Sequence, residues 1–557
     1  MNRLCVSTLM LLAGTAAPAL AQFAGPSTAQ TSYMVPSDPS SGVRFISFAS
    51  NGNNAAAGRP NETFLNLFTG TNDYRLVGIP DGMGVFRTEQ DIREGTMTVL
   101  VNHEIGAAAS TVRAHGNTGS FVSQWRVVAD PTRGDFLRVI GGGDLSTQTN
   151  LWNGAGYTAY NSGSPAPAGW GRQCSADLAP VSAYQWTDAS GRTFGTDARI
   201  FMTGEEVGAE GRAIAYVATG TDARQSYQLP AHGRYSWENS VANPFSQRQT
   251  IVMGTDDATP GNVYFYVGEK QDTGNAIERA GLTNGGVYGI VVNGGNNTIS
   301  GTQRVEDRTN VLGNASTGRV ESAAFSLVAM PDQRNATGAS LQALSDQTQQ
   351  LNFLRPEDAA WNPSNPAQAI FCTTDSFTGN SRLWAMNFSD ITNPTAGGQI
   401  TMLADGGNGA SIGGGYSSAT GQTSVRMMDN LAVSRFNQVL IQEDVGNNAH
   451  LGRIWLYDMA ADSMLEIGIS DASRFTTGGA NYFGTQDEET SGIVDAWDII
   501  GPGWWLLDMQ AHYGISGELV EGGQLMAVFI PQTVPTPAGA ALLALGGLAA
   551  TRRRRSK

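Results

Sequence analysis

A repeated strand–acid–loop–strand pattern constrains the fold of this 557-residue chain more than any other feature. The segment Ile200 to Gly220 (IFMTGEEVGAEGRAIAYVATG) reads as a strand, an acidic corner, a glycine-bearing loop and a return strand opened by Arg212. The segment Val439 to Tyr457 (VLIQEDVGNNAHLGRIWLY) repeats this order well over two hundred residues later. Two copies so far apart indicate a fold built from repeats, with carboxylates at the strand ends.

Four further apolar hairpins have a polar corner of the same kind: Met97 to Gly106, Thr250 to Val267, Ala369 to Met386 and Gly503 to Phe529. Abundant glycine (69 residues) and few charged residues (15 %) favour tight turns over helices. We therefore predict an all-β fold, a six-bladed β-propeller with long inter-blade insertions, in which the corners meet at one mouth of a central channel. A β-sandwich or a pair of β domains, with acids scattered over loop tips, is the alternative.

The N-terminus reads as a processing signal. Residues 1–21 have a positive start at Arg3, an apolar stretch and a small-x-small cleavage site before Gln22, which predicts a secretory signal peptide. A membrane-spanning helix is the alternative, but Gly14 and Pro18 interrupt the stretch. The chain is therefore expected to be exported.

The C-terminus reads as a second processing signal. Residues 534–557 combine Val-Pro-Thr-Pro, a short apolar run and four consecutive arginines. This pattern is similar to PEP-CTERM sorting tails, which exosortase-type enzymes process in Gram-negative bacteria; a plain C-terminal anchor is the alternative. The expected location is the periplasm, cell surface or extracellular matrix, with transient membrane association through the tail and residues 22–533 as the folded domain.

Charge and cysteine content limit the partners. Removal of both ends changes the formal charge from −15 to −21, because Arg3, four C-terminal arginines and Lys557 leave with them. So acidic a chain repels nucleic acid and attracts divalent cations, and we expect no nucleic-acid partner. After loss of Cys5, the remaining Cys174 and Cys372 either form a disulfide, as is common in oxidising compartments, or serve elsewhere.

The acidic corners suit hard cations. Paired acids such as Glu205-Glu206, Asp256-Asp257 and Glu443-Asp444 repel each other unless they are solvated or bind cations. Calcium takes six to eight oxygen ligands, which a ring of loops can supply. The chain contains neither an HExxH zinc motif nor a P-loop, which argues against the enzymes that depend on them.

The order of these motifs resembles the PhoX family of exported bacterial alkaline phosphatases. From Met97 to Gly514 the chain reads NHE, a lone Cys, TGEE, GRYSWE, TDDA, RPED, DNLAV and QAH. The resemblance implies a six-bladed propeller whose channel mouth holds iron and calcium and cleaves small phosphomonoesters. Departures lie around the cysteine, where QCSADLAP replaces a glycine-rich turn, at Trp237, where the family usually has His, and at QAH, which replaces QHP.

The resemblance also implies the site residues. In that family a cysteine thiolate binds iron, and Cys174 is the matching position, in keeping with the preference of iron for soft sulfur and of calcium for carboxylates. Arg382 matches a phosphate-binding arginine. The acids that match metal ligands are Glu206, Glu238, Asp257, Glu357, Asp429 and Asp444. Two other functions stay open: a calcium propeller of another hydrolytic type, such as a lactonase, and a non-catalytic protein of the envelope or matrix.

Overall fold

The computed structural model describes residues 22–52, 62–292, 304–305, 323–377, 379, 381–406 and 414–531. The predicted signal peptide (1–21) and sorting tail (534–557) lie outside these residues, as does part of the glycine-rich tract 406–421, which reads as an insertion between blades. Among the described residues, no helix has the length and apolar character needed to cross a membrane.

Most described elements are strands in antiparallel sheets, which confirms the predicted all-β class. One sheet contains β4 (Pro80–Phe86), β5 (Thr96–His103), β6 (Phe121–Val128) and β7 (Val139–Asp144). The next has the order β10 (Gln173–Asp177), β13 (Ile200–Glu205), β14 (Ala213–Val217), β15 (Gln225–Gln228), β8 (Gln148–Trp152) and β9 (Tyr157–Asn161).

The middle of the chain forms one continuous nine-stranded sheet. Its first part is β16 (Trp237–Ala242), β17 (Gln249–Asp256), β18 (Val263–Glu269), β19 (Gly286–Val292) and β21 (Ala323–Ala329). Strand β21 pairs with β26 (Gly398–Asp405), which continues through β25 (Arg382–Phe388) and β24 (Gln368–Thr373) to β23 (Pro356–Trp361). Two inner strands, β16 and β23, therefore lie at the two ends of the same sheet.

The last two large sheets bring both ends of the described chain together. One has the order β2 (Met34–Pro36), β31 (Ser463–Ser470), β30 (Arg453–Asp458), β29 (Gln438–Glu443) and β28 (Met428–Val433), with β27 (Tyr416–Ser417) beside β31. The other runs β1 (Gln22–Ala24), β3 (Arg44–Ser50), β34 (Glu521–Phe529), β33 (Trp504–Gly514) and β32 (Glu488–Asp495). N-terminal strands thus complete both C-terminal sheets.

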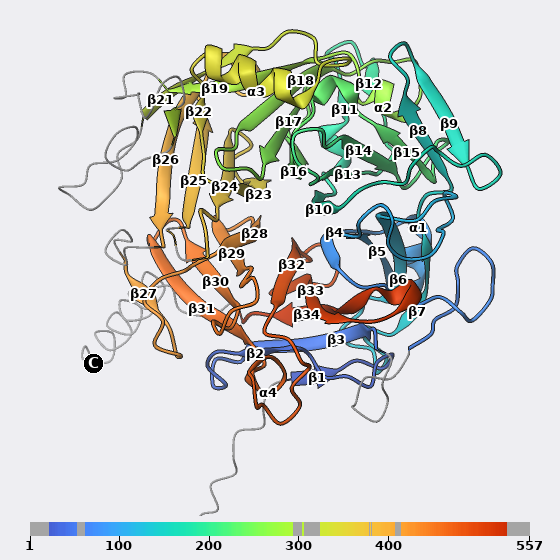
Figure 1. Cartoon of the computed structure of the whole chain (residues 1–557), viewed down its shortest axis with the longest axis vertical. Coiled ribbons are helices and arrows are strands. Elements are labelled where there is room, and N and C mark those ends of the chain that lie inside the picture. The colour runs from blue at the N-terminus through green and yellow to red at the C-terminus, as the bar shows by residue number, and fades with distance from the viewer. Residues whose placement is uncertain are drawn as a thin grey trace, which may run out of the picture.

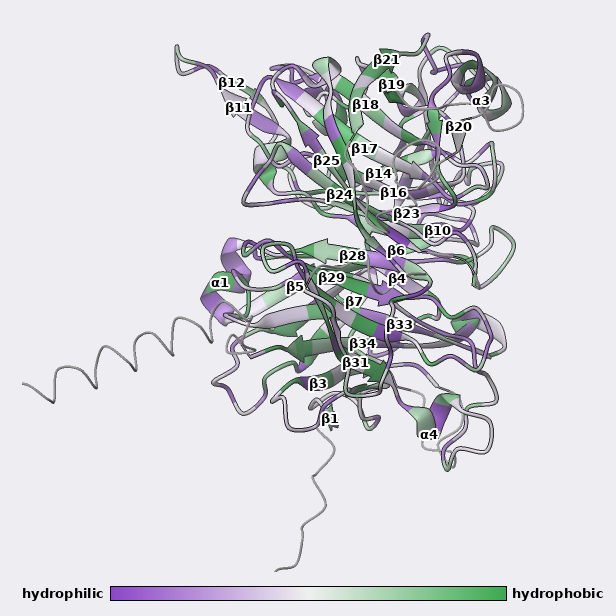
Figure 2. Ribbon diagram, turned by 90° about the vertical axis from the view of Figure 1, so that its left-hand side faces the viewer, coloured by the Kyte–Doolittle hydropathy of each residue, from purple (hydrophilic) through white to green (hydrophobic). Residues whose placement is uncertain are grey.

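Small elements lie at the edge. The two-stranded pieces are β11 (Gln185–Thr187) with β12 (Thr193–Gly195), and β20 (Arg304–Val305) with β22 (Leu351–Asn352). The helices are α1 (Glu89–Glu94), α2 (Ala276–Arg279), α3 (Gly338–Gln347) and α4 (Ala472–Phe475). Most of the polar tract 342–350 lies in α3, and β22 begins directly after it. Figure 2 shows α1 as a hydrophilic helix at the rim.

The inner strands close a ring. β4 contacts β10, and the contacts continue through β16, β23, β28 and β32 back to β4. Figure 1 shows the sheets radiating outward from these strands. Apolar side chains fill the spaces between neighbouring sheets: Met202 packs in one cluster with Val252, and Phe265 in another with Trp384. Each fully buried large side chain contributes roughly 1.5–3 kcal/mol, so the outward parts of the sheets supply the stability and leave the centre for polar residues.

Candidate metal centre

The centre of the ring is built by one register position that recurs in every inner hairpin. The register pairs that open these hairpins are Pro80 with His103, Gln173 with Glu205, Trp237 with Asp256, Pro356 with Thr373, Met428 with Glu443, and Glu488 with Ala511. The next residues on the inner strands are Asp81, Cys174, Glu238, Glu357, Asp429 and Glu489. Each inner strand thus supplies one carboxylate or thiol at the same level.

A bulge accompanies five of these positions. In β4, β10, β16, β23 and β28 the register shifts directly after the opening pair, so the candidate ligand leaves the regular ladder. A bulge bends the strand locally and re-aims a side chain, which is why bulges are common beside functional sites. The sixth strand, β32, keeps Glu489 in register with Gln510 and bulges further along.

The second strand of each hairpin supplies the facing residue. In each hairpin it is the residue that directly follows the second-strand member of the opening pair. These residues are Glu104, Glu206, Asp257, Thr374, Asp444 and His512. All of them except Thr374, and all of the inner-strand residues except Asp81, line one cavity of about 410 Å³. Four hairpins therefore contribute two of these residues and two hairpins contribute one, and all of them converge on one mouth of the ring although they are spread over most of the chain.

The structure brings the predicted ligands together. The cavity is lined by all seven of them: Cys174, Glu206, Glu238, Asp257, Glu357, Asp429 and Asp444. Their binding of metal remains a prediction. Arg382 opens β25, where it pairs in register with Thr373 and Asp405, and it is not among the described residues that line the cavity. The arginines that do line it are Arg172 and Arg355.

In each acid pair, the first member holds the loop and the second faces the cavity. Glu205 accepts hydrogen bonds from Arg212 and from the Gly171 backbone (2.7 Å). Asp256 accepts hydrogen bonds from the backbone N–H groups of Ser236 (3.1 Å) and Asn262 (3.3 Å). The pairs are therefore not two solvated charges, and only the second member is available to a ligand.

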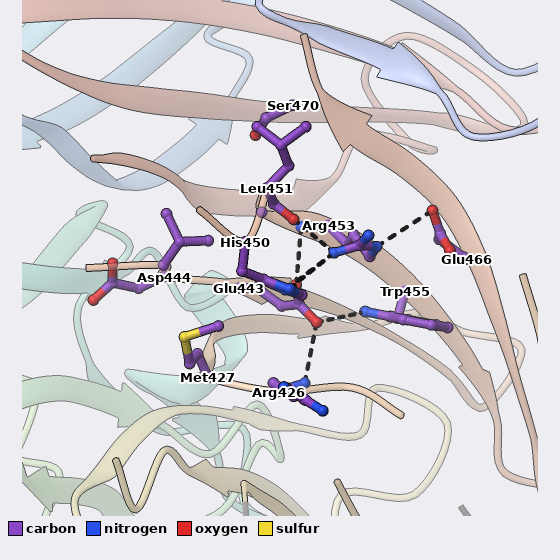
Figure 3. Close-up of polar contacts among 12 residues, drawn as sticks. Arg426, Met427, Glu443, Asp444, His450, Leu451, Arg453, Trp455, Glu466 and Ser470 are labelled. Atoms are coloured by element: carbon purple, nitrogen blue, oxygen red, sulfur yellow. Dashed lines mark hydrogen bonds and ion pairs between the residues drawn. The ribbon is translucent and has the colours of Figure 1, made fainter. Parts of the chain in front are cut away.

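Glu443 shows this division most clearly (Figure 3). Its carboxylate accepts hydrogen bonds from the Trp455 indole at 2.9 Å, the His450 imidazole at 2.8 Å, and the backbone N–H groups of Arg426 at 3.1 Å and Arg453 at 3.2 Å. Asp444 turns away from this group and lines the cavity. A buried carboxylate with this many donors organises its loop.

We expect Glu443→Ala to lower the free energy of unfolding by about 3 kcal/mol, because it leaves several buried donors without an acceptor. Asp444→Ala changes one residue further along, and in metal-free protein it is expected to cost far less, since it removes a carboxyl whose pKa burial raises. Urea unfolding of the two variants side by side tests this division. Equal losses of stability would contradict it.

The candidate ligands form linked groups. In each group, one ligand atom per residue lies within 4.8 Å of the others. The groups are Asp81, Glu104 and Cys174; Cys174, Glu206 and Glu238; Glu238, Asp257 and Glu357; and Asp429, Asp444 and Glu489. Cys174 and Glu238 each belong to two groups, so they would bridge neighbouring cations.

The electrostatics of the cavity fit cations. Asp81 Oδ1 and Glu238 Oε1 are buried without a hydrogen-bond partner among the described residues. Burial, together with the charges of Glu357 and Asp429, raises the pKa of Glu238 well above its usual range, and burial and nearby acids do the same to the Cys174 thiol. Bound divalent cations would lower these pKa values instead, because they favour the deprotonated carboxylate and thiolate.

The raised carboxyl pKa values make the stability of metal-free protein depend on pH. Burial, followed by the charge of Glu104, raises the pKa of Glu206 from 4.5 to about 8. Between these two values the folded state binds more protons than the unfolded state, so stability falls as the pH rises, by roughly 4 kcal/mol for this group alone. The urea midpoint of chelator-treated protein should be higher at pH 5 than at pH 8, and Glu206→Gln should flatten the difference. A higher midpoint at pH 8 in both proteins would overturn this reading.

Two arginines and a glutamine organise the carboxylates. Arg355 binds Asp257 at 2.9 and 3.0 Å and lies 3.0 Å from Glu357. Arg172 bridges Glu104 and Glu206. The Gln510 amide nitrogen lies 3.1–3.3 Å from oxygens of Asp81, Glu104 and Glu489. Because the Arg172 side chain is 50 % exposed and that of Arg355 28 %, both guanidinium groups can also reach an anion in the cavity.

Sequence reasoning did not identify all of these residues. It assigned no role to Glu104, which ends the NHE motif, or to Glu489, Asp81, Arg172 and Arg355. The recurring register position is the signal that would have found Asp81 and Glu489. The disulfide left open by the sequence is not formed: Cys174 and Cys372 are both buried free thiols. Cys372 donates to the Asp429 carbonyl at 2.9 Å and does not line the cavity.

The chain was compared with known proteins at three levels. No protein-family model matches it, and neither does any curated protein. Two solved structures are only weakly similar to this chain. A protein of unknown function from Dyadobacter fermentans has 9 % sequence identity and a TM-score of 0.34, and the match covers 88 % of this chain and 100 % of that chain. The soluble aldose sugar dehydrogenase of Escherichia coli has 11 % identity and a TM-score of 0.25, and the match covers 64 % of this chain and 99 % of that chain. The structure of Pseudomonas fluorescens PhoX in complex with vanadate, a transition state analogue, matches this chain with a TM-score of 0.60 at 11 % sequence identity. The match covers 91 % of this chain and 97 % of the PhoX chain. The chain therefore has a PhoX-like fold.

Proposed function

We propose that this chain is an exported, metal-dependent hydrolase that resembles the PhoX alkaline phosphatases and cleaves phosphomonoesters at a cluster of calcium and iron. The observation that carries the proposal is the convergence of Cys174 and eight acids of the candidate ligand groups on a cavity that is also lined by Arg172 and Arg355. The eight acids are Glu104, Glu206, Glu238, Asp257, Glu357, Asp429, Asp444 and Glu489. The likeness of fold to a PhoX structure with bound vanadate supports it.

The donor set decides which cations fit. The carboxylates supply the oxygen ligands that calcium prefers, whereas the single thiolate of Cys174, shared by two candidate groups, suits iron. When bound, such ions supply Lewis acidity and stabilise the charge that develops on a transferring phosphoryl group. The bulged inner strands would hold these ions through Cys174, Glu238, Glu357 and Asp429.

The arginines favour a phosphate ester over a lactone. A phosphomonoester is a dianion, and a guanidinium group binds two of its oxygens at once. Arg355 and Arg172 both reach the cavity, and a neutral lactone needs neither of them. Phosphate binding by Arg382, expected from the family resemblance, is not part of this proposal, because Arg382 does not line the cavity.

The proposal extends to the fold and to the location of the protein. We infer that the ring β4, β10, β16, β23, β28 and β32 marks six propeller blades, each a four-stranded antiparallel run, the last of them completed by β3. Residues 1–21 would direct the chain to the periplasm, cell surface or extracellular matrix and would be cleaved off during export. An exosortase-type enzyme would process the tail at 534–557, with transient membrane association.

A substrate panel tests the proposed activity. With calcium and iron supplied at equal loading, the full chain is expected to release phosphate from 4-nitrophenyl phosphate and to leave a simple lactone intact. Arg355→Gln should lower kcat/KM by about a hundredfold, through the loss of a charged contact worth roughly 3 kcal/mol. Hydrolysis of the lactone instead would favour a lactonase. Full metal content without any hydrolysis would favour the non-catalytic protein.

A further inference from the structure

His512 occupies a position that other hairpins give to acids. It directly follows Ala511, the register partner of Glu488, as Glu104, Glu206, Asp257 and Asp444 follow the corresponding residues of their hairpins. Its side chain lines the same cavity. The mouth of the ring therefore contains one imidazole, at a level otherwise occupied by candidate ligand carboxylates.

Glu521 fixes the orientation of this imidazole. His512 Nδ1 lies 2.6 Å from Glu521 Oε2, on the neighbouring strand β34. The Glu521 carboxylate accepts a hydrogen bond from Nδ1–H, so the second ring nitrogen, Nε2, is the site where a proton can be gained or lost. None of the described residues hydrogen-bonds Nε2. The backbone N–H of His512 donates to the Asp487 carbonyl at 3.2 Å and holds the strand in place.

His512 differs from a metal ligand in its surroundings. It belongs to none of the candidate ligand groups among the described residues. Its side chain is 24 % exposed and that of Glu521 is 29 % exposed, so both contact solvent as well as the cavity. An imidazole that is oriented by a carboxylate, open to water and directed into the reaction cavity has the properties of a proton donor.

We propose that His512, oriented by Glu521, is the general acid that protonates the leaving oxygen during hydrolysis of phosphomonoesters; the inference rests on the proposed function. As an oxygen from water forms its bond to phosphorus, the bond between phosphorus and the ester oxygen breaks. The electron pair stays on the ester oxygen, which takes the proton from Nε2 and leaves as an alcohol. The attacking water loses one proton to solvent, His512 recovers a proton from solvent at Nε2, and the Nδ1 proton stays on the imidazole, hydrogen-bonded to Glu521.

The dependence of rate on the leaving group tests this role. An alkyl phosphate needs a proton donor because an alkoxide leaves poorly, whereas 4-nitrophenolate leaves well without one. His512→Gln is expected to lower kcat for an alkyl phosphate by about a hundredfold or more, as is typical for loss of a general acid, and kcat for 4-nitrophenyl phosphate far less. Glu521→Gln should change the ratio of the two rates in the same direction, to a smaller extent.

His450→Gln is the matched control, because His450 also binds a carboxylate, Glu443, but does not line the cavity. It should leave the ratio of the two rates unchanged. Equal losses on both substrates with loss of metal would show that His512 is a ligand, and unchanged rates would show that it has no role in proton transfer. Wild-type protein that hydrolyses neither phosphate would overturn the proposed function and this inference with it, whereas an unaltered ratio in an active His512→Gln enzyme would overturn this inference alone.

Discussion

Glu238→Gln is expected to remove bound metal and to lower kcat/KM for a phosphomonoester by about a thousandfold, or roughly 4 kcal/mol of transition-state stabilisation. Glu238 is 1 % exposed, belongs to two candidate ligand groups and has one carboxylate oxygen without a hydrogen-bond partner among the described residues. An amide keeps the shape of the side chain but lacks the charge that holds a divalent cation.

The same variant should have the opposite effect on metal-free protein. Without cations, burial and then the neighbouring acids raise the pKa of Glu238, so folding must protonate this carboxyl, and its replacement by an amide is expected to raise the urea midpoint. Glu466→Gln is the matched control, since Glu466 is a buried carboxylate of β31 with the hydroxyls of Ser37 and Thr420 as partners, outside the cavity. It should keep full metal content. Unchanged metal content and activity in Glu238→Gln would show that Glu238 is not a metal ligand.

Cys174→Ser is expected to abolish iron binding while calcium binding persists, and to lower activity at least a hundredfold. A serine hydroxyl is a hard and weakly acidic group, whereas iron is held by a thiolate. Elemental analysis, together with loss of any absorption from an iron–thiolate bond, measures the effect. Retention of iron by the variant would show that the acids alone hold it.

Cys372→Ser is the control for Cys174, because Cys372 is also a buried free thiol but donates a hydrogen bond to a backbone carbonyl. It should keep iron and activity. If both variants lost iron equally, general destabilisation rather than ligation would explain the result. The comparison is possible because both thiols are free: if the two cysteines formed a disulfide, either substitution would change both of them.

The repeated hairpins were enough to predict the all-β class and the convergence of acids. The pair at Glu205 and Glu206 and the pair at Glu443 and Asp444 carry one local pattern, and the structure gives both pairs the same division of roles. Which member faces the cavity depends on the register between strands, which determines the side of the sheet that each side chain occupies.

The remaining residues depend on contacts that local pattern does not encode. Asp81 stands in a glycine-rich strand without a neighbouring acid, and only the bulge after Pro80 brings it to the ring. Arg355 precedes Glu357 by two residues, yet its role appears only through its contact with Asp257 of a different hairpin. The family resemblance pointed instead to Arg382, which opens β25 and is not among the described residues that line the cavity.

The identity and number of bound metals test the central claim most directly. The measurement is elemental analysis of the full chain, purified from its native export route without chelator. The account predicts calcium in more than one equivalent together with iron, both lost on chelation along with phosphatase activity. Protein that is folded and carries neither metal, or that carries calcium but no iron while Cys174 stays reactive toward thiol reagents, would contradict the proposed calcium and iron cluster.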